Sequence, residues 1–293
     1  MRSKLFVPAS RPELFSKALN SQADILSFDL EDAVREDRKA GARHSLAAFL
    51  DDPALDQSNK AVMIRINPFG SPHFDDDLAV AVHRRTDWIN LPKPQSAQAV
   101  REAAARVSAL EQRLSSRHPD RPPIRLLINI ETPLALFKAL ELAQADPRVA
   151  GLQVGLADLF EPHGIDRRER RAVEHVLMQT AFAAHAAGVA AFDGAFPHIA
   201  DLDGLRAEAS FARRLGFQGK SCIHPNQISV INDVFSPTQD EIAFATKIIE
   251  AEARATISGQ AAFTVDGKMI DPPFVLRARV ILNQSKPSGS HQP

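Results

Sequence analysis

Short apolar runs alternate with longer stretches of helical periodicity along most of the chain. Several runs are continuously apolar, which is typical of strands that are covered by helices outside and by packed side chains inside. The eight runs are Lys4–Ala9, Ile25–Leu30, Ala61–Asn67, Trp88–Lys93, Ile124–Glu131, Leu152–Leu159, Val189–Phe196 and Gly219–His224. Helical patterns between them cover Glu13–Asn20, Ser96–Ser115, Pro133–Ala145, Arg168–Ala187 and Asp203–Leu215.

Strands that alternate with helices predict βαβ units and a parallel sheet. Eight units within roughly the first 225 residues favour a closed (βα)8 TIM barrel, and an open doubly wound sheet is the alternative. We expect a catalytic barrel over residues 1–235, a C-terminal helical extension and arm over 236–284, and a disordered tail over 285–293. Within the extension, Pro237–Ser258 and Phe274–Leu282 carry helical patterns, and Gly259–Asp271 is a turn-rich link between them.

The composition narrows the class of protein. The chain has 293 residues, 44% hydrophobic content and a net charge of −1, so no basic surface for nucleic acid or an anionic membrane is indicated. Cys222 is the single cysteine, which fits a reducing compartment. The first apolar run stops at Pro8, unlike a signal peptide. We therefore expect a cytoplasmic enzyme with neither nucleic-acid nor membrane partners.

The predicted strands end in polar residues, at the face of a barrel where catalytic groups gather. These residues are Asp29-Leu30-Glu31-Asp32, Arg65-Ile66-Asn67, Pro92-Lys93, Glu131, Asp158, Asp193 and His224. Converging carboxylates repel one another unless a cation lies among them. Oxygen ligands without a cysteine pair suit Mg²⁺, which takes one or two protein carboxylates and leaves its other positions to water and substrate.

Eight motifs occur in order along the chain, at the spacing of barrel strands. They are RSKLFVPA at 2–9, FDLEDAV at 28–34, RIN at 65–67, LPK at 91–93, INIET at 128–132, GLADL at 155–159, IHPNQ at 223–227 and DGKMIDPP at 266–273. This set resembles the citrate lyase β-subunit family of the HpcH/HpaI aldolase superfamily, which includes malyl-CoA and citramalyl-CoA lyases. The resemblance covers residue 2 to about residue 283.

The resemblance implies a role for each acidic or basic strand end. Glu131 and Asp158 match two Mg²⁺ ligands, and they also end consecutive predicted strands, so they should be neighbours at the barrel mouth. Carboxylates satisfied by helix N-caps or arginines are the alternative. Arg65 matches a catalytic arginine that stabilises the substrate oxygen, and the alternative is a structural salt bridge to Asp29 or Glu31.

Five further residues are candidates by the same resemblance. Glu31 and Asp32 would hydrogen-bond metal-bound water or the catalytic arginine. Asp271 would be an acid/base that the arm donates to a neighbouring subunit, and the alternative is an N-cap before Pro-Pro. Lys93 and Arg11 are candidates for binding the CoA substrate. The implied assembly is a homotrimer or homohexamer with exchanged arms.

The function that the resemblance implies is a Mg²⁺-dependent carbon–carbon lyase. It would cleave a citryl-, malyl- or citramalyl-type 3-hydroxyacyl-CoA to acetyl-CoA and a 2-keto acid. The alternatives are a malyl-CoA thioesterase or malate synthase activity at the same site, a class II pyruvate aldolase, and a citrate lyase β subunit that needs partners and acts on an acyl-carrier-protein thioester. No histidine precedes His44, whereas such aldolases carry a His/Arg dyad near the first strand, and this weighs against the aldolase.

Overall fold

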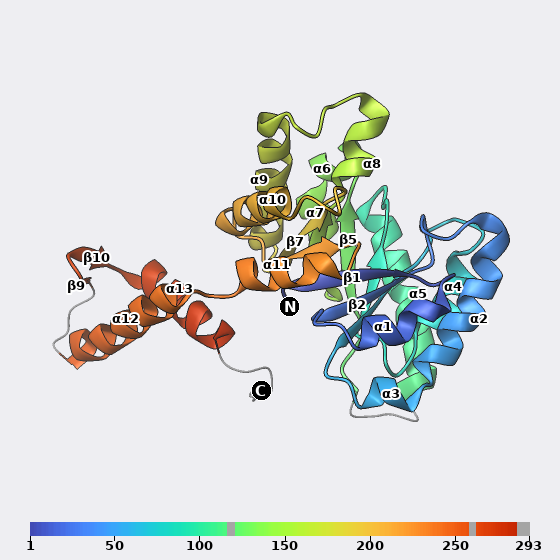
Figure 1. Ribbon diagram of the computed structural model, residues 1–293, viewed down its shortest axis with the longest axis horizontal. Coiled ribbons are helices and arrows are strands. Elements are labelled where there is room, and N and C mark those ends of the chain that lie inside the picture. The colour runs from blue at the N-terminus through green and yellow to red at the C-terminus, as the bar shows by residue number, and fades with distance from the viewer. Residues whose placement is uncertain (116–120, 258–261, 286–293) are drawn as a thin grey trace. The chain divides into compact units, whose positions relative to one another are not determined.

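The chain forms a closed barrel of eight parallel strands, each paired with the next and β8 paired with β1 (Figure 1). The computed structural model describes residues 1–115, 121–257 and 262–285. The strands are β1 (Ser3–Pro8), β2 (Ile25–Asp29), β3 (Ala61–Arg65), β4 (Trp88–Leu91), β5 (Arg125–Ile130), β6 (Val149–Val154), β7 (Ala190–Ala195) and β8 (Gly219–Cys222). The predicted TIM barrel is therefore confirmed, and the open sheet is excluded.

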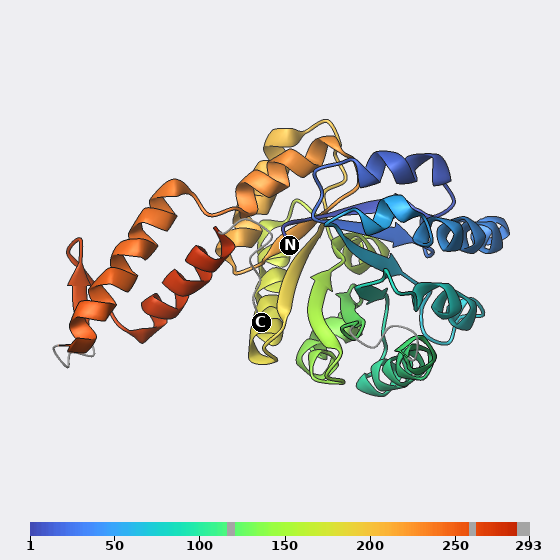
Figure 2. The same ribbon diagram turned by 90° about the horizontal axis from the view of Figure 1, so that it is seen from below.

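Helices cover the outside of the strands (Figure 2). They are α1 (Phe15–Leu19), α2 (Lys39–Leu50), α3 (Pro53–Asp56), α4 (Phe74–Ala81), α5 (Ala97–Ser115), α6 (Pro133–Phe137), α7 (Ala139–Ala143), α8 (Leu156–Phe160), α9 (Arg170–Ala186), α10 (Leu202–Arg214) and α11 (Asn226–Phe235). The 3-10 helices among the described residues are η1 (Pro12–Leu14), η2 (Glu36–Arg38) and η3 (Glu161–His163). The single helix expected over Pro133–Ala145 is two helices, interrupted at Lys138, whose φ is −102° and ψ is 11°.

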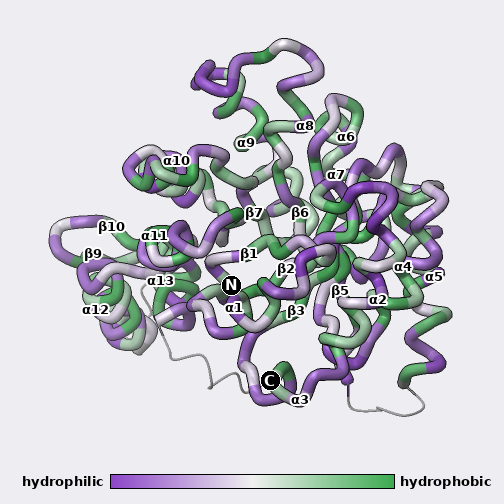
Figure 3. Tube along the Cα trace, turned by 45° about the vertical axis from the view of Figure 1, so that its right-hand side comes forward, coloured by the Kyte–Doolittle hydropathy of each residue, from purple (hydrophilic) through white to green (hydrophobic). Residues whose placement is uncertain are grey.

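The barrel interior changes from apolar to polar along the strands. Toward their amino ends, a buried apolar cluster joins side chains of β2, β3, β4, β5 and β7: Ile25, Met63, Trp88, Leu127 and Phe192. Side chains two residues further on point to the same face of a strand. That step leads from Ile25 to Ser27 and Asp29, and from Leu127 to Asn129, so the next interior layers are polar. The outer loops are also largely hydrophilic (Figure 3).

The chain divides into two compact units, Met1–Asn232 and Asp233–Pro293. The second unit contains α12 (Gln239–Ile257), a hairpin of β9 (Phe263–Val265) and β10 (Lys268–Ile270), and α13 (Pro272–Gln284). Its core includes Val265, Ile270 and Val275. Of the tail expected at 285–293, residues 286–293 lie outside the described part of the chain.

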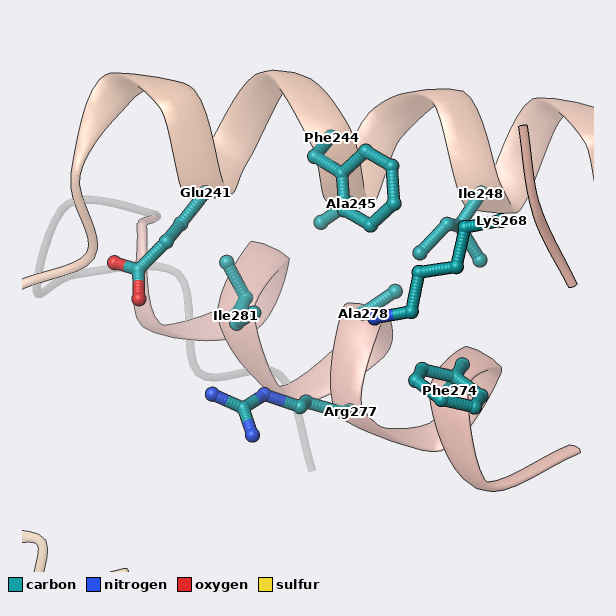
Figure 4. A pocket seen from close by; sticks show the side chains of 9 residues that line it. All are labelled: Glu241, Phe244, Ala245, Ile248, Lys268, Phe274, Arg277, Ala278 and Ile281. Atoms are coloured by element: carbon teal, nitrogen blue, oxygen red, sulfur yellow. The ribbon is translucent and has the colours of Figure 1, made fainter. Parts of the chain in front are cut away.

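The hairpin replaces part of the link expected over Gly259–Asp271. Asp266 and Gly267 both have positive φ, 49° and 79°, which a type I′ turn requires. A groove between α12 and α13 is lined mainly by apolar side chains, together with the charged Glu241, Lys268 and Arg277 (Figure 4). Among residues 1–115, 121–257 and 262–285, no helix has the length and hydropathy of a membrane span.

Candidate active site

The polar strand ends meet at one end of the barrel. Asp29 and Arg65 are the last residues of β2 and β3, and they are register partners. Glu131 directly follows β5. Asp158 is not at a strand end as predicted, because β6 stops at Val154 and Asp158 lies in the first turn of α8. These residues nevertheless lie close enough for their charges to interact, as the contacts below show.

Asp29 and Arg65 form a bidentate ion pair. Nε and Nη2 of Arg65 donate to the two carboxylate oxygens of Asp29 at 2.7 and 2.6 Å. The same oxygens accept the backbone N–H groups of Glu31 and Ala33, both at 3.0 Å. Asp29 therefore anchors both the guanidinium and the turn after β2. The structural salt bridge raised as an alternative for Arg65 is present, and it holds the guanidinium in one orientation.

Glu31 and Asp32 extend the acidic cluster on the other side of Arg65. Oε2 of Glu31 lies 2.9 Å from Nη1 of Arg65, and within the described residues it has no aligned hydrogen-bond donor. Burial raises the pKa of Glu31, against the opposing charges of Arg65 and Lys93. Burial also opposes ionisation of Asp32, but its hydrogen bond and charge interaction with Lys93 lower its pKa.

Lys93 lies inside this cluster. Its ammonium is 2.9 Å from Oε1 of Glu31, 3.0 Å from Oδ2 of Asp32 and 3.4 Å from Oδ1 of Asp158. Its backbone N–H donates to Oε1 of Glu131 at 3.0 Å. Lys93 thus contacts four carboxylates of the site. By contrast, Arg11 lies on the surface and pairs with Glu13.

Of the two carboxylates that the sequence predicts as metal ligands, Glu131 is more buried than Asp158. Its oxygens accept the backbone N–H of Lys93 and Nδ2 of Asn129, each at 3.0 Å. Burial, together with the charges of Asp158 and Glu31, raises the pKa of Glu131 to about 7 against the opposing charges of Arg65 and Lys93. Glu131 and Asp158, which the sequence suggested as neighbours, both contact Lys93.

Gly155 makes room for Glu131. A Cβ at Gly155 would lie 2.5 Å from Cβ of Glu131 and 2.7 Å from its Oε2. The backbone N–H of Gly155 donates to the carbonyl of Ile130 at 3.0 Å. The turn between β6 and α8 is thus packed directly against the Glu131 side chain, which brings Asp158 to the same place. The sequence motif included Gly155, but the close approach became visible only in the fold.

A buried group beneath the acidic turn was missed by the sequence reasoning. Nζ of Lys39 donates to the carbonyls of Leu30 and Glu31 and to Oδ1 of Asn67, at 3.0, 3.1 and 2.8 Å. Asn67 in turn donates to the carbonyl of Leu30 and to Asp77. These bonds fix the main chain that presents Glu31. A lysine five residues beyond the FDLEDAV motif gives no sequence signal of its partners.

The interior below the site is also polar. Lys4 on β1 donates to Oε1 of Gln153, and its ammonium lies 4.3 Å from the centre of the Phe6 ring. The Arg65 guanidinium lies 4.9 Å from the centre of the same ring. Burial lowers the pKa of Lys4 well below its usual value. Asn129 joins Glu131 to Asn90, whose Nδ2 donates to Oδ1 of Asn129 at 2.7 Å.

The donor set suits a hard cation that keeps several water ligands. Five carboxylates, those of Asp29, Glu31, Asp32, Glu131 and Asp158, face two close cations, Arg65 and Lys93. In the described part of the chain, no three acidic, histidine or cysteine side chains enclose an ion by themselves. Two carboxylates completed by water and substrate are the usual arrangement for Mg²⁺.

Asp271 belongs to the second unit, at the N-cap position of α13. Its side chain makes no cap hydrogen bond, because Pro272 and Pro273 lack N–H groups and Phe274 donates to the backbone carbonyl of Asp271. Among the described residues, Oδ1 of Asp271 is buried without a hydrogen-bond partner. The N-cap alternative is therefore not realised by the side chain.

These features define a class: a (βα)8 barrel with a cluster of acidic residues and a fixed arginine at the carboxyl ends of its strands. Residues 2–225 match the family model "HpcH/HpaI aldolase/citrate lyase", and the chain belongs to this family.

Curated relatives cover nearly the whole chain. Citrate lyase subunit beta of Haemophilus influenzae is 33% identical over 292 residues, 97% of each chain. A (3S)-malyl-CoA thioesterase of Cereibacter sphaeroides is 34% identical over 286 residues, covering 97% of this chain and 94% of the relative. Among solved structures, protein CitE of Mycobacterium tuberculosis in complex with magnesium, acetoacetate and coenzyme A has a TM-score of 0.77 and 32% identity over 97% of each chain.

Proposed function

We propose that this protein is a Mg²⁺-dependent carbon–carbon lyase that cleaves a 3-hydroxyacyl-CoA of the citryl, malyl or citramalyl type. The products would be acetyl-CoA and a 2-keto acid. The observation that carries the proposal is that Glu131 and Asp158 both contact Lys93, at 3.0 Å from its backbone N and 3.4 Å from its Nζ, beside a rigidly held Arg65 at the barrel mouth. Family membership supports the lyase class, and the CitE complex with magnesium and coenzyme A supports the cofactor and the substrate class.

In this proposal Glu131 and Asp158 would bind the ion, which polarises the substrate's carboxylate and hydroxyl oxygens when bound. Arg65 donates to the oxygen that changes from hydroxyl to carbonyl during cleavage. As the hydroxyl passes its proton to solvent water, the electron pair of the breaking carbon–carbon bond passes to the thioester fragment, which becomes an enolate. Asp29 keeps the guanidinium in place through its paired hydrogen bonds, so no reorientation is needed during the reaction.

The enolate must then gain a proton at carbon. We assign this step to Asp271, whose Oδ1 has no hydrogen-bond partner among the described residues. We further propose that the second unit donates Asp271 to the site of a neighbouring subunit in a homotrimer or homohexamer. Mixing inactive Asp271→Asn with inactive Glu131→Ala protein should then restore part of the activity. No recovery after confirmed subunit exchange would exclude donation between subunits.

Hydrolysis of the thioester is the second candidate function, because the Cereibacter sphaeroides relatives are named malyl-CoA thioesterases. It would give free CoA and a hydroxy acid in place of acetyl-CoA and a keto acid. A partner-dependent β subunit that acts on an acyl-carrier-protein thioester is a further alternative, favoured by the citrate lyase β relatives.

Purified protein with Mg²⁺ should form acetyl-CoA from at least one of citryl-, malyl- and citramalyl-CoA. Asp158→Ala should lose roughly a hundredfold or more of kcat, in line with removal of a metal-held oxygen. Asp166→Ala is the matched control, because Asp166 is a surface carboxylate paired with Arg168 outside the site. Absence of turnover with all three thioesters would refute the free-CoA lyase.

A further inference from the structure

Lys93 has an unusual backbone conformation. It stands between Pro92 and Pro94, and its φ is 50°, in the left-handed region that non-glycine residues seldom adopt. A following proline disfavours the right-handed helical conformation for the residue before it. In this conformation the backbone N–H of Lys93 reaches Glu131 while the side chain turns back into the acidic cluster. Strained residues of this kind concentrate at functional sites.

The Lys93 ammonium and the proposed ion would use the same carboxylates. The ammonium contacts Glu31 and Asp32 after β2, and it lies 3.4 Å from Oδ1 of Asp158 in α8. Asp158 is one of the two proposed ligands, and Glu131 is bound to the backbone of the same lysine. A divalent ion shared by Glu131 and Asp158 would therefore lie beside a unit positive charge, at a separation where like charges repel strongly.

We propose that Lys93 is a built-in competitor for the divalent ion. Its ammonium leaves Asp158 when the ion binds. Lys93 therefore lowers the affinity for Mg²⁺, and metal binding frees the ammonium of Lys93 at the barrel mouth. The Lys93 side chain is 29% exposed, so it has an open direction in which to move. This inference rests on the proposed function, because it assumes that Glu131 and Asp158 hold the ion.

Replacement of the charge separates this role from a purely structural one. Lys93→Met keeps an unbranched apolar side chain that is one atom shorter and removes the ammonium. We expect it to bind Mg²⁺ about 10- to 100-fold more tightly than the wild type, because one repulsive charge next to the ion is lost. Damage to the fold would weaken binding, so a gain in affinity cannot arise from a poorly folded variant.

The measurement is isothermal titration calorimetry with Mg²⁺, and Mn²⁺ as a second ion, on the full chain without CoA. Lys93→Arg, which keeps the charge, should stay near the wild-type affinity, and Lys17→Met on the exposed face of α1 is the control. An affinity of Lys93→Met equal to or below that of the wild type would overturn the role of Lys93 and leave the metal site intact. Absence of Mg²⁺ binding in both proteins would overturn the proposed function as well.

A second readout follows the lysine itself. Acylation of lysines, quantified by peptide mass spectrometry, should label Lys93 several-fold faster when Mg²⁺ is added, because the ammonium is then released from its carboxylates. Labelling of Lys17 should not change. Equal labelling of Lys93 with and without Mg²⁺, at concentrations where calorimetry shows binding, would rule out the release.

Discussion

Gly155 offers a test of the site geometry, because the expected loss of stability follows from the distance between an added Cβ and Glu131. A methyl group in Gly155→Ala would lie 2.5 Å from Cβ of Glu131. Carbon atoms pack at about 3.5–4.0 Å, so Glu131 or the turn before α8 must move by about 1 Å. Overpacking of this kind costs about 1–3 kcal/mol, which corresponds to a fall in Tm of roughly 2–10 °C for a chain of this size.

The same displacement should weaken metal binding. If Glu131 moves by about 1 Å, its oxygen leaves the position from which it would share the ion with Asp158. Misplacement of this size can reduce activity about a hundredfold. We expect Gly155→Ala to lower both Tm, measured by circular dichroism, and the Mg²⁺ affinity measured by calorimetry, the latter at least about tenfold.

Gly41→Ala is the matched control, because Gly41 lies in α2 and a Cβ there meets no atom within 4 Å. It should stabilise the fold by about 0.5–1 kcal/mol. In a Glu131→Gly background, the contact partner is absent, so Gly155→Ala should cost much less. Equal costs in both backgrounds, or an unchanged Mg²⁺ affinity, would refute the close-packing argument.

Three further predictions concern the acidic cluster and its support. The pKa of Glu131 is about 7 in the fold and about 4.3 in an unfolded chain, so its contribution to stability is lost as pH rises between these values. Without divalent ions, the free energy of unfolding of Glu131→Gln should therefore gain about 1–3 kcal/mol relative to that of the wild type from pH 5 to pH 8 in denaturant titrations. A difference between the two proteins that does not change with pH would contradict the raised pKa. Arg65→Lys keeps the charge but loses the two hydrogen bonds to Asp29, so kcat should fall about 100-fold or more with little change in Mg²⁺ affinity. A variant with the kcat of the wild type would show that the two parallel hydrogen bonds of the guanidinium are not needed. Lys39→Met leaves the carbonyl of Glu31 and Oδ1 of Asn67 without the ammonium that donates to them, while the carbonyl of Leu30 keeps its hydrogen bond from Asn67. The free energy of unfolding should therefore fall by about 2–4 kcal/mol in urea titrations, and an unchanged midpoint would exclude the support role.

Sequence reasoning identified the barrel because its signal is local. Each strand is an apolar run such as Ile25–Leu30, and its end is marked by the polar residues that follow. Arg65 and Glu131 were found for this reason, since a strand end fixes which face of the barrel a residue reaches. The structure places both at that face.

Features that depend on contacts between distant segments were not predictable. The apolar pattern of Leu152–Leu159 does not distinguish a strand from the first turn of a helix, so Asp158 was assigned to the wrong element. The close packing of Gly155 and the position of the Lys93 ammonium arise only when neighbouring strands meet. The Asp266-Gly267 turn was a readable hairpin signal, but the flanking strands have three residues each and little periodicity.

The most direct test of the central claim is the product balance in heavy water. The protein with Mg²⁺ and malyl- or citramalyl-CoA should form acetyl-CoA and the 2-keto acid in equal amounts, detected by NMR. The acetyl group should carry one deuterium, because the enolate takes its proton from an exchangeable acid. Chelation of the metal should stop the reaction, and added Mg²⁺ should restore it. Formation of free CoA and the hydroxy acid, without keto acid, would show thioester hydrolysis and contradict a carbon–carbon lyase.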